Sequence, residues 1–249
     1  MTILNTQHRA KSYNQRIRHI IIHYTAVPFN EALYLLTETN VSAHYLISAE
    51  KNPQIYALVD EQDRAWHAGQ SYWQGSTGLN DSSIVIELEN LGFSENPREK
   101  IWQPFPESQI TTLIELLLDL QRRYSISPTH ILGHSDIAPG RKWDPGALFP
   151  WEALYQAGVG AWPEASRVTH YQQRFEKQLP PIRWLQTHLH TYGYHIDITG
   201  EFDNTTEKTL SAFQLHFRQK KIDGRFDAET GAILASLIER YFPQAISCL

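Results

Sequence analysis

The sequence has almost no cysteine, no long apolar run and no excess of positive charge. Cys248 is the only cysteine among 249 residues, so no disulfide can form within the chain, and oxidising and reducing compartments both remain open. The formal net charge of -5 at pH 7 argues against a nucleic-acid partner. No stretch approaches the roughly 18 consecutive apolar residues of a membrane-spanning helix, so we expect no membrane span.

The first twenty residues are polar and basic and lack the apolar core of about 7–15 residues that marks a signal peptide, so no signal peptide is visible. The rest of the composition is that of an ordinary globular protein, with 41% hydrophobic and 20% charged residues. The length fits one large domain, or a medium domain with a smaller one. The 12 histidines are unusually many and justify a search for metal ligands.

Short apolar runs bounded by turn residues predict strands in the first part of the chain. These runs lie at 18–28, 42–48, 54–60, 81–90 and 129–134. Residues 106–124 instead carry an apolar stripe at helical spacing, formed by Ile110, Leu113, Ile114, Leu117 and Leu120. Together these elements predict an α/β fold with a mixed central sheet packed by helices.

The pattern changes after Trp151. Residues 155–181 mix glycine, proline and charge without a sustained period and read as a linker, whereas 182–242 are helical. The helical part contains a repeat, because GEFDNTT at 200–206 matches GRFDAET at 224–230, with Asp203 and Asp227 as N-caps. This repeat predicts a small three-helix domain with its own core. We expect domain boundaries at 1–157, 158–180 for the linker, and 181–249.

The stretch GHSDIAPGRKWDPG at 133–146 combines an imidazole, an ammonium group and carboxylates with several glycines and prolines. Glycine and proline at this density exclude a regular helix or a central strand, so we expect His134, Lys142 and Asp144 on a loop of fixed shape. Together with His23, at a strand end, His134 and Asp144 form a candidate zinc site with a fourth position open to water. Spacing alone leaves His23 open to the alternative of an ordinary core histidine.

The chain resembles the zinc-dependent N-acetylmuramoyl-L-alanine amidases of the AmpD/AmiD type, which share a fold with peptidoglycan recognition proteins. The segments that carry the resemblance occur in family order: IIHYT, SAHYLI, RAWHAG, LNDSSIVIELEN and GHSDIAPGRKWDPG. The C-terminal part resembles a peptidoglycan-binding helical domain through LQTHLHTYGY, GEFDNTTEKTLSAFQ and DGRFDAET. The resemblance implies hydrolysis of the amide between N-acetylmuramic acid, in its ordinary or 1,6-anhydro form, and L-alanine.

Residue by residue, the resemblance implies one Zn²⁺ per chain, bound by the metal ligands His23, His134 and Asp144. It implies that Glu87 is the catalytic glutamate and that Lys142 stabilises the transition state. An amide needs this help, because a general base must take a proton from water and the developing oxyanion must be stabilised. Glu89, two residues after Glu87 and on the same strand face, remains the alternative base.

Three further residues are candidates for binding the substrate in its groove. Trp66 and His67 in WHAG are expected to line it, and His44 either faces it or makes a supporting hydrogen bond. Val85 departs from the family, which usually has glycine there. Because Val85 shares a strand face with Glu87, we expect it to narrow the groove.

The expected partners are peptidoglycan and muropeptides, and the oligomeric state stays open. A periplasmic or cell-envelope location fits a wall-binding domain, with the cytoplasm as the alternative. Two other functions use much the same sequence: a recognition module that binds peptidoglycan without cutting it, and a secreted toxin that degrades cell walls. Because no proposed catalytic residue lies in the helical domain, we expect a chain ending near residue 180 to retain the chemical step.

Overall fold

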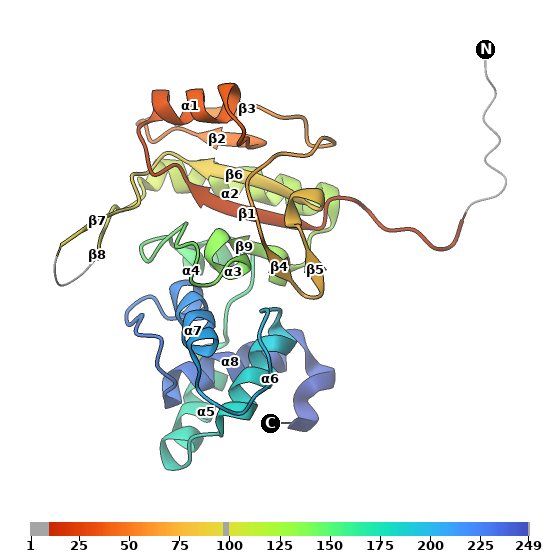
Figure 1. Cartoon of the computed structure of the whole chain (residues 1–249), viewed down its shortest axis with the longest axis vertical. Helices are drawn as coiled ribbons and strands as arrows, with labels where there is room; N and C mark the ends of the chain where they lie inside the picture. Colours follow the sequence, from red (N-terminus) through yellow and green to blue (C-terminus); the bar gives the residue numbers. More distant parts are fainter. Residues whose placement is uncertain (1–9, 97–99, 249) are drawn as a thin grey trace.

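The computed structural model describes residues 10–96 and 100–248, so the polar stretch at 1–20 lies partly outside the described residues. Within the described ranges, a five-stranded sheet has the order β3-β2-β6-β1-β9 (Figure 1). The strands β2, β6, β1 and β9 are parallel, and β3 is antiparallel to β2, which confirms the mixed sheet. Their bounds are β1 (His19–Tyr24), β2 (Tyr45–Ile47), β3 (Ile55–Ala57), β6 (Ser83–Leu88) and β9 (Ile131–Gly133).

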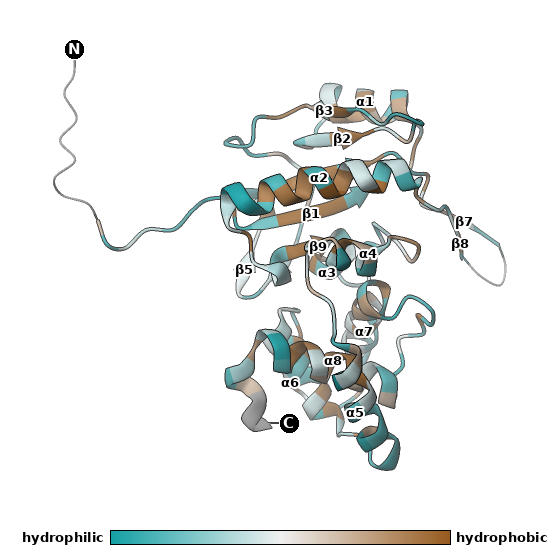
Figure 2. Ribbon diagram, turned by 180° about the vertical axis from the view of Figure 1, so that it is seen from behind, coloured by the Kyte–Doolittle hydropathy of each residue, from teal (hydrophilic) through white to brown (hydrophobic). Residues whose placement is uncertain are grey.

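Helix α2 (Glu107–Tyr124) covers one face of the sheet and confirms the helix predicted at 106–124 (Figure 2). Its buried apolar residues pack with alternate residues of β1 and β6. The residues that share this core are Ile20, Ile22, Ile84, Ile86, Leu88, Ile110, Leu113, Leu117 and Leu120. Because side chains alternate along a strand, Ile21, His23, Val85 and Glu87 belong to the other face.

Shorter elements surround the sheet: α1 (Phe29–Glu38), β4 (Tyr72–Trp73), β5 (Ser76–Thr77), η1 (Leu79–Asp81), β7 (Phe93–Glu95), β8 (Lys100–Trp102), η2 (Pro128–His130), α3 (His134–Ile137) and α4 (Trp151–Gln156). The one-turn helix α3 corrects part of the sequence prediction, because His134 begins a helical turn rather than lying on a loop. Lys142 and Asp144 do lie on the loop that follows.

The C-terminal part contains α5 (Ala165–Lys177), α6 (Ile182–Tyr192), α7 (Asn204–Phe217), α8 (Ala228–Tyr241) and η3 (Pro243–Cys248). Helices α6, α7 and α8 are the three predicted helices, and Asp203 and Asp227 cap α7 and α8 as expected. Helix α5 lies inside the segment predicted to be a linker. It packs on α8 through Tyr171 and Phe175, so this segment is not an irregular connection. The domain boundaries themselves stay a prediction.

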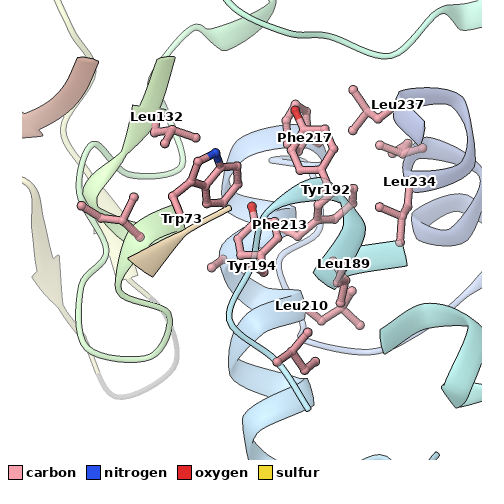
Figure 3. Packing of buried hydrophobic residues seen from close by; sticks show 14 of the residues in the cluster. Trp73, Leu132, Leu189, Tyr192, Tyr194, Leu210, Phe213, Phe217, Leu234 and Leu237 are labelled. Atoms are coloured by element: carbon pink, nitrogen blue, oxygen red, sulfur yellow. The ribbon is translucent and has the colours of Figure 1, made fainter. Parts of the chain in front are cut away.

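The C-terminal helices lie beyond the β9 edge of the sheet, next to α3 (Figure 1). A single apolar cluster joins the two parts, so the main core of the helical part is continuous with the catalytic part, although a smaller cluster between α5 and α8 lies within the helical part alone. The ring of Trp73 from β4 meets the rings of Tyr192 and Tyr194 edge to face, with centroids 5.9 and 4.9 Å away (Figure 3). Among the described residues, no helix is long and apolar enough to cross a membrane.

Candidate metal centre and active site

Three neighbouring parallel strands end at the same edge of the sheet and bring the candidate residues together. His23 lies near the end of β1, Glu87 near the end of β6, and His134 directly follows β9. His23 and Glu87 are register partners across the β1–β6 pair. The carboxyl ends of parallel strands are where open α/β sheets place their ligand sites. The sheet order therefore explains how residues so distant in sequence form one site.

His23, His134 and Asp144 form the predicted ligand set, with one ligand atom from each lying within 4.8 Å of the others. The Asp144 Oδ2 atom is 2.9 Å from His23 Nδ1 and 3.1 Å from His134 Nδ1. All three residues are buried. Two imidazole nitrogens and one carboxylate oxygen are donors that suit zinc, and three protein ligands leave a further position open.

A chain of hydrogen bonds fixes which nitrogen of His23 carries its proton. The Ser83 hydroxyl donates to the Leu79 carbonyl at 2.7 Å, so Ser83 Oγ accepts from His67 Nε2 at 2.9 Å. His67 Nδ1 is then without a proton and accepts from His23 Nε2 at 3.1 Å. The lone pair of His23 Nδ1 therefore points toward Asp144, as a ligand nitrogen requires.

His134 is oriented in the same way, because its Nε2 donates to the Ala68 carbonyl at 3.2 Å and leaves Nδ1 free. Burial, then the nearby His134, lower the pKa of His23 to about 4, so the ring is neutral at pH 7. Burial opposes ionisation of Asp144, but the protonated forms of His134 and His23 outweigh it and hold its pKa well below the usual range; a bound metal ion would take the place of these protons. Neutral imidazoles and an ionised carboxylate are the forms that bind a metal ion.

Glu87 lies beside the ligand set, with Oε1 3.8 Å from His23 Nδ1. Its Oε2 is buried and has no hydrogen-bond partner among the described residues. Burial, then the charge of Asp144, raise the pKa of Glu87 to about 8, while the positive charge of Lys142 opposes this rise. A buried carboxylate oxygen without a protein donor next to three ligands is suited to accept a proton from water.

Glu89, the alternative base, has a structural role. Its Oε1 accepts from the Phe29 N–H at the start of α1, and its Oε2 accepts from the Ala49 N–H at 2.7 Å. Both oxygens are therefore occupied by backbone donors, unlike the free Oε2 of Glu87. This difference favours Glu87 over Glu89 as the base.

The structure decides between the two alternatives for His44 and corrects the expectations for Val85 and His67. His44 is fully buried, accepts from the Val85 N–H at Nδ1 and donates to the Asp63 carbonyl from Nε2, so it supports the core instead of contacting substrate. Val85 is also fully buried and packs with Ala43 and Ala65, so it does not narrow a groove. The main contact of His67 is the ligand His23, which makes it a support for the metal site.

Trp66 remains a substrate-contact candidate. Its ring is 54% exposed and carries the Arg64 guanidinium 4.0 Å above its centroid. Lys142 is half-buried, and its charge acts on both Glu87 and His23. Lys142 therefore belongs to the charged surroundings of the base.

Sequence reasoning missed Asp136, which lies between the ligands His134 and Asp144 in sequence and is only 1% exposed. It accepts from Tyr194 and His216, both of the C-terminal part. The signal was present in GHSDI, where an acid follows the ligand at two residues. Its two distant partners carry no motif that pairs them with it.

Comparison with known proteins agrees with this site. Residues 13–147 match the family model described as N-acetylmuramoyl-L-alanine amidase, and residues 178–234 match a putative peptidoglycan binding domain. The chain is 44% identical to the N-acetylmuramoyl-L-alanine amidase AmiD of Escherichia coli over 246 residues, covering 96% of this chain and 88% of the relative. It is 45% identical to AmpD of Haemophilus influenzae over 116 residues, covering 46% of this chain and 57% of that protein.

Solved structures give the same result over almost the whole chain. AmiD from E. coli superposes with a TM-score of 0.87 at 42% identity, covering 96% of this chain and 95% of that one. AmpDh3 from Pseudomonas aeruginosa superposes with a TM-score of 0.90 at 40% identity, covering 97% and 99%. With this likeness and the geometry above, the chain belongs to the N-acetylmuramoyl-L-alanine amidases and is an enzyme of that activity.

Proposed function

We propose that the enzyme is zinc-dependent, with His23, His134 and Asp144 as ligands, Glu87 as general base and Lys142 as the group that stabilises the developing oxyanion. The observation that carries this proposal is the free Oε2 of Glu87 beside three buried, pre-oriented ligands. Other carboxylates nearby, such as Glu89 and Asp136, have their oxygens occupied by donors.

The donor set fits Zn²⁺, because both imidazoles present Nδ1 to one point and each is held by a hydrogen bond from its other nitrogen. When bound, zinc supplies Lewis acidity that polarises a carbonyl and makes water more acidic. The positive charge also opposes the effect of burial on Glu87 and so favours its ionised form.

Glu87 and Lys142 then divide the remaining work. Glu87 Oε2 takes a proton from water and delivers it to the amide nitrogen, so that the poor leaving group departs as an amine. Lys142 places its ammonium charge near the base and the ligands, where it offsets negative charge on the amide oxygen. Asp144 stays ionised and does not compete for the proton.

The substrate class is muropeptides, including those with 1,6-anhydro-N-acetylmuramic acid. AmiD was solved with the substrate anhydro-N-acetylmuramic acid-L-Ala-D-gamma-Glu-L-Lys, and AmpDh3 with an anhydromuramic pentapeptide. The high identity to both supports the same substrates here. We assign Trp66 to substrate contact, because this aromatic residue of WHAG is 54% exposed and can pack on sugar carbons.

The match of residues 178–234 to a peptidoglycan-binding domain supports action on the cell wall, in turnover or recycling of peptidoglycan. We therefore propose a cell-envelope location. We also retain 1–157 as the segment that carries the catalytic residues and 181–249 as the helical segment, although the two share a core.

The test is digestion of a synthetic anhydro-muropeptide and of purified sacculi, with product masses and bound zinc measured for the wild type and two variants. We expect about one zinc per chain and a mass change that corresponds to cleavage between the sugar and L-alanine. Glu87→Gln should keep the zinc but turn over about 100-fold more slowly, on the scale of general-base effects.

Glu89→Gln is the matched control, since it changes a carboxylate two residues away on the same strand. It should keep turnover within a few-fold but lose stability, because one backbone donor keeps only a neutral acceptor and the other loses its acceptor. Greater loss of turnover in Glu89→Gln than in Glu87→Gln would refute the assignment of the base. Full turnover by the metal-free wild type would refute the metal site.

A further inference from the structure

Two side chains of the helical part meet one buried carboxylate of the catalytic part. Tyr194 donates its hydroxyl to Asp136 Oδ1 at 2.6 Å, and His216 donates from Nδ1 to Asp136 Oδ2 at 2.8 Å. Asp136, His216 and Tyr194 are 1%, 3% and 0% exposed. Hydrogen bonds to an ionised acceptor are roughly twice as strong as neutral ones, and burial increases the cost of losing them.

The aromatic packing holds both donors in place. The His216 ring stacks between Trp151, 3.7 Å away at 16°, and Phe217, 3.9 Å away at 12°. Tyr194 packs edge to face on Trp73 (Figure 3). The other nitrogen of His216, Nε2, has no partner among the described residues, so the bond to Asp136 is the polar contact that sets this ring. Neither donor can turn away without losing packing.

Asp136 in turn fixes the backbone at the first metal ligand. Its Oδ2 accepts from the Gly133 N–H at 2.8 Å, which ties the carboxylate to the residue just before His134. The next residue, Ser135, donates its N–H to the Asp144 carbonyl at 2.9 Å. Movement of Asp136 would therefore be transmitted to both His134 and Asp144.

The chain from Gly133 to Gly140 is packed so closely against its neighbours that it cannot move without them. A Cβ on Gly133 would lie 2.6 Å from Pro145 Cδ, so the start of α3 presses on the segment that follows Asp144. A Cβ on Gly140 would lie 2.5 Å from Lys208 Cδ, so the loop before Lys142 rests directly on α7. The helical part thus contacts the segment between the two ligands at two points, Asp136 and Gly140.

We propose that Tyr194 and His216 are positioning residues for the metal ligands: through Asp136 they hold α3 and the following loop so that His134 and Asp144 present their ligand atoms to one point. The helical part then belongs to the support of the active site in addition to any role in binding the wall. This inference rests on the proposed metal site.

The test compares Tyr194→Phe and His216→Phe, which keep an aromatic ring and remove only the donor to Asp136, in the full-length chain. Metal affinity is measured by competition with a chromogenic chelator, and ligand geometry by the visible absorption spectrum of the Co²⁺-substituted protein. We expect each variant to bind zinc about tenfold more weakly, the lower end of what supporting residues contribute, and to show a changed Co²⁺ spectrum.

Tyr171→Phe is the matched control, because it also removes a tyrosine hydroxyl that donates to a carboxylate, Glu239, at 3.0 Å, but within the helical part. It should leave metal affinity and the Co²⁺ spectrum unchanged. Measurements are made well below the lowest melting temperature, so that unfolding does not contribute.

If Tyr194→Phe and His216→Phe lower the melting temperature but keep the wild-type affinity and spectrum, the contact is only structural and the inference is wrong. Tyr194→Phe, the milder change, keeps the test decisive if His216→Phe does not fold. A wild type that binds no zinc fails at an earlier step and overturns the proposed metal site, which distinguishes the two failures.

Discussion

The helical part contains two copies of one unit, and the copies differ in what their histidine contacts. In each copy a fully buried glutamine, Gln186 or Gln214, donates to a loop carbonyl and to a threonine hydroxyl and accepts from a glycine N–H. Two residues later stands a histidine. His188 bonds to the Trp184 carbonyl of its own helix at 2.7 Å, whereas His216 bonds to Asp136.

The difference shows how a repeated unit acquires a second use. The buried glutamine and the capping aspartate build the same turn in both copies, so those positions serve the fold. The histidine position has no part in that turn and can face either its own helix or a neighbour. The second copy faces α3, and its histidine therefore contributes to docking on the catalytic part.

The largest expected effect comes from removing both copies. A chain ending near residue 180 would expose Trp73, Leu132 and Ile137, which are buried against the helical part. Full burial of one large apolar side chain contributes about 1.5–3 kcal/mol, so the three together, roughly 4.5–9 kcal/mol, are comparable with the whole stability of a typical domain, about 5–15 kcal/mol. We expect the truncated chain to aggregate or to melt without a cooperative transition.

This expectation reverses the prediction from sequence that the truncated chain keeps the chemical step. The measurement is the yield of soluble protein together with thermal unfolding followed by tryptophan fluorescence. A soluble truncated chain that cleaves an anhydro-muropeptide at the wild-type rate would contradict this expectation. It would show that the catalytic part folds and functions without the helical part.

Much of the site was predictable because its residues stand in local motifs. His23 and Glu87 lie near the ends of predicted strands, and the stretch at 133–146 holds both remaining ligands. The hydrogen-bond chain from His23 through His67 to Ser83 was not predictable, because it depends on which strands are neighbours. The fold class was readable from periodicity, whereas strand order was not.

The docking residues were missed for a different reason. Asp136 and His216 are 80 residues apart, and no pattern within either segment refers to the other. A signal did exist in the repeat, since Gln-x-His occurs at 186–188 and again at 214–216. Helix α5 was missed because its apolar stripe is sparse, with only Tyr171 and Phe175 buried in it.

The second prediction concerns the buried glutamine, which makes the same kinds of hydrogen bond in both copies. Gln186→Leu and Gln214→Leu each remove a fully buried amide that satisfies loop groups. Each should destabilise the protein by about 2–4 kcal/mol, because several buried donors and acceptors lose a partner at about 1–3 kcal/mol each. Urea unfolding followed by far-ultraviolet circular dichroism gives both values. A loss in one variant more than twice the loss in the other would show that the turns are not equivalent.

The smallest expected effect concerns the two capping aspartates, whose hydrogen-bond partners differ between the copies. Asp203 accepts from the backbone and hydroxyl of Thr206, whereas Asp227 makes the same bonds to Thr230 and also accepts from the Arg218 guanidinium at 2.7 and 2.6 Å. The Arg218 side chain is only 2% exposed. Asp227→Ala therefore leaves part of a buried cation unpaired, which Asp203→Ala does not.

We expect Asp227→Ala to cost about 2 kcal/mol, a cap plus an ion pair discounted for the partial exposure of Asp227, and Asp203→Ala to cost less. Burial of Asp227 opposes ionisation, but hydrogen bonds from Thr230 and Arg218 outweigh it and lower its pKa. A lowered folded-state pKa means that the stabilisation is present above the unfolded pKa of about 3.9 and is lost as pH falls through the folded value. The deficit of Asp227→Ala in urea unfolding should accordingly be full at pH 7 and shrink below about pH 4. An equal deficit for both caps at pH 7, or one that grows on acidification, would show that Arg218 does not distinguish the second copy from the first.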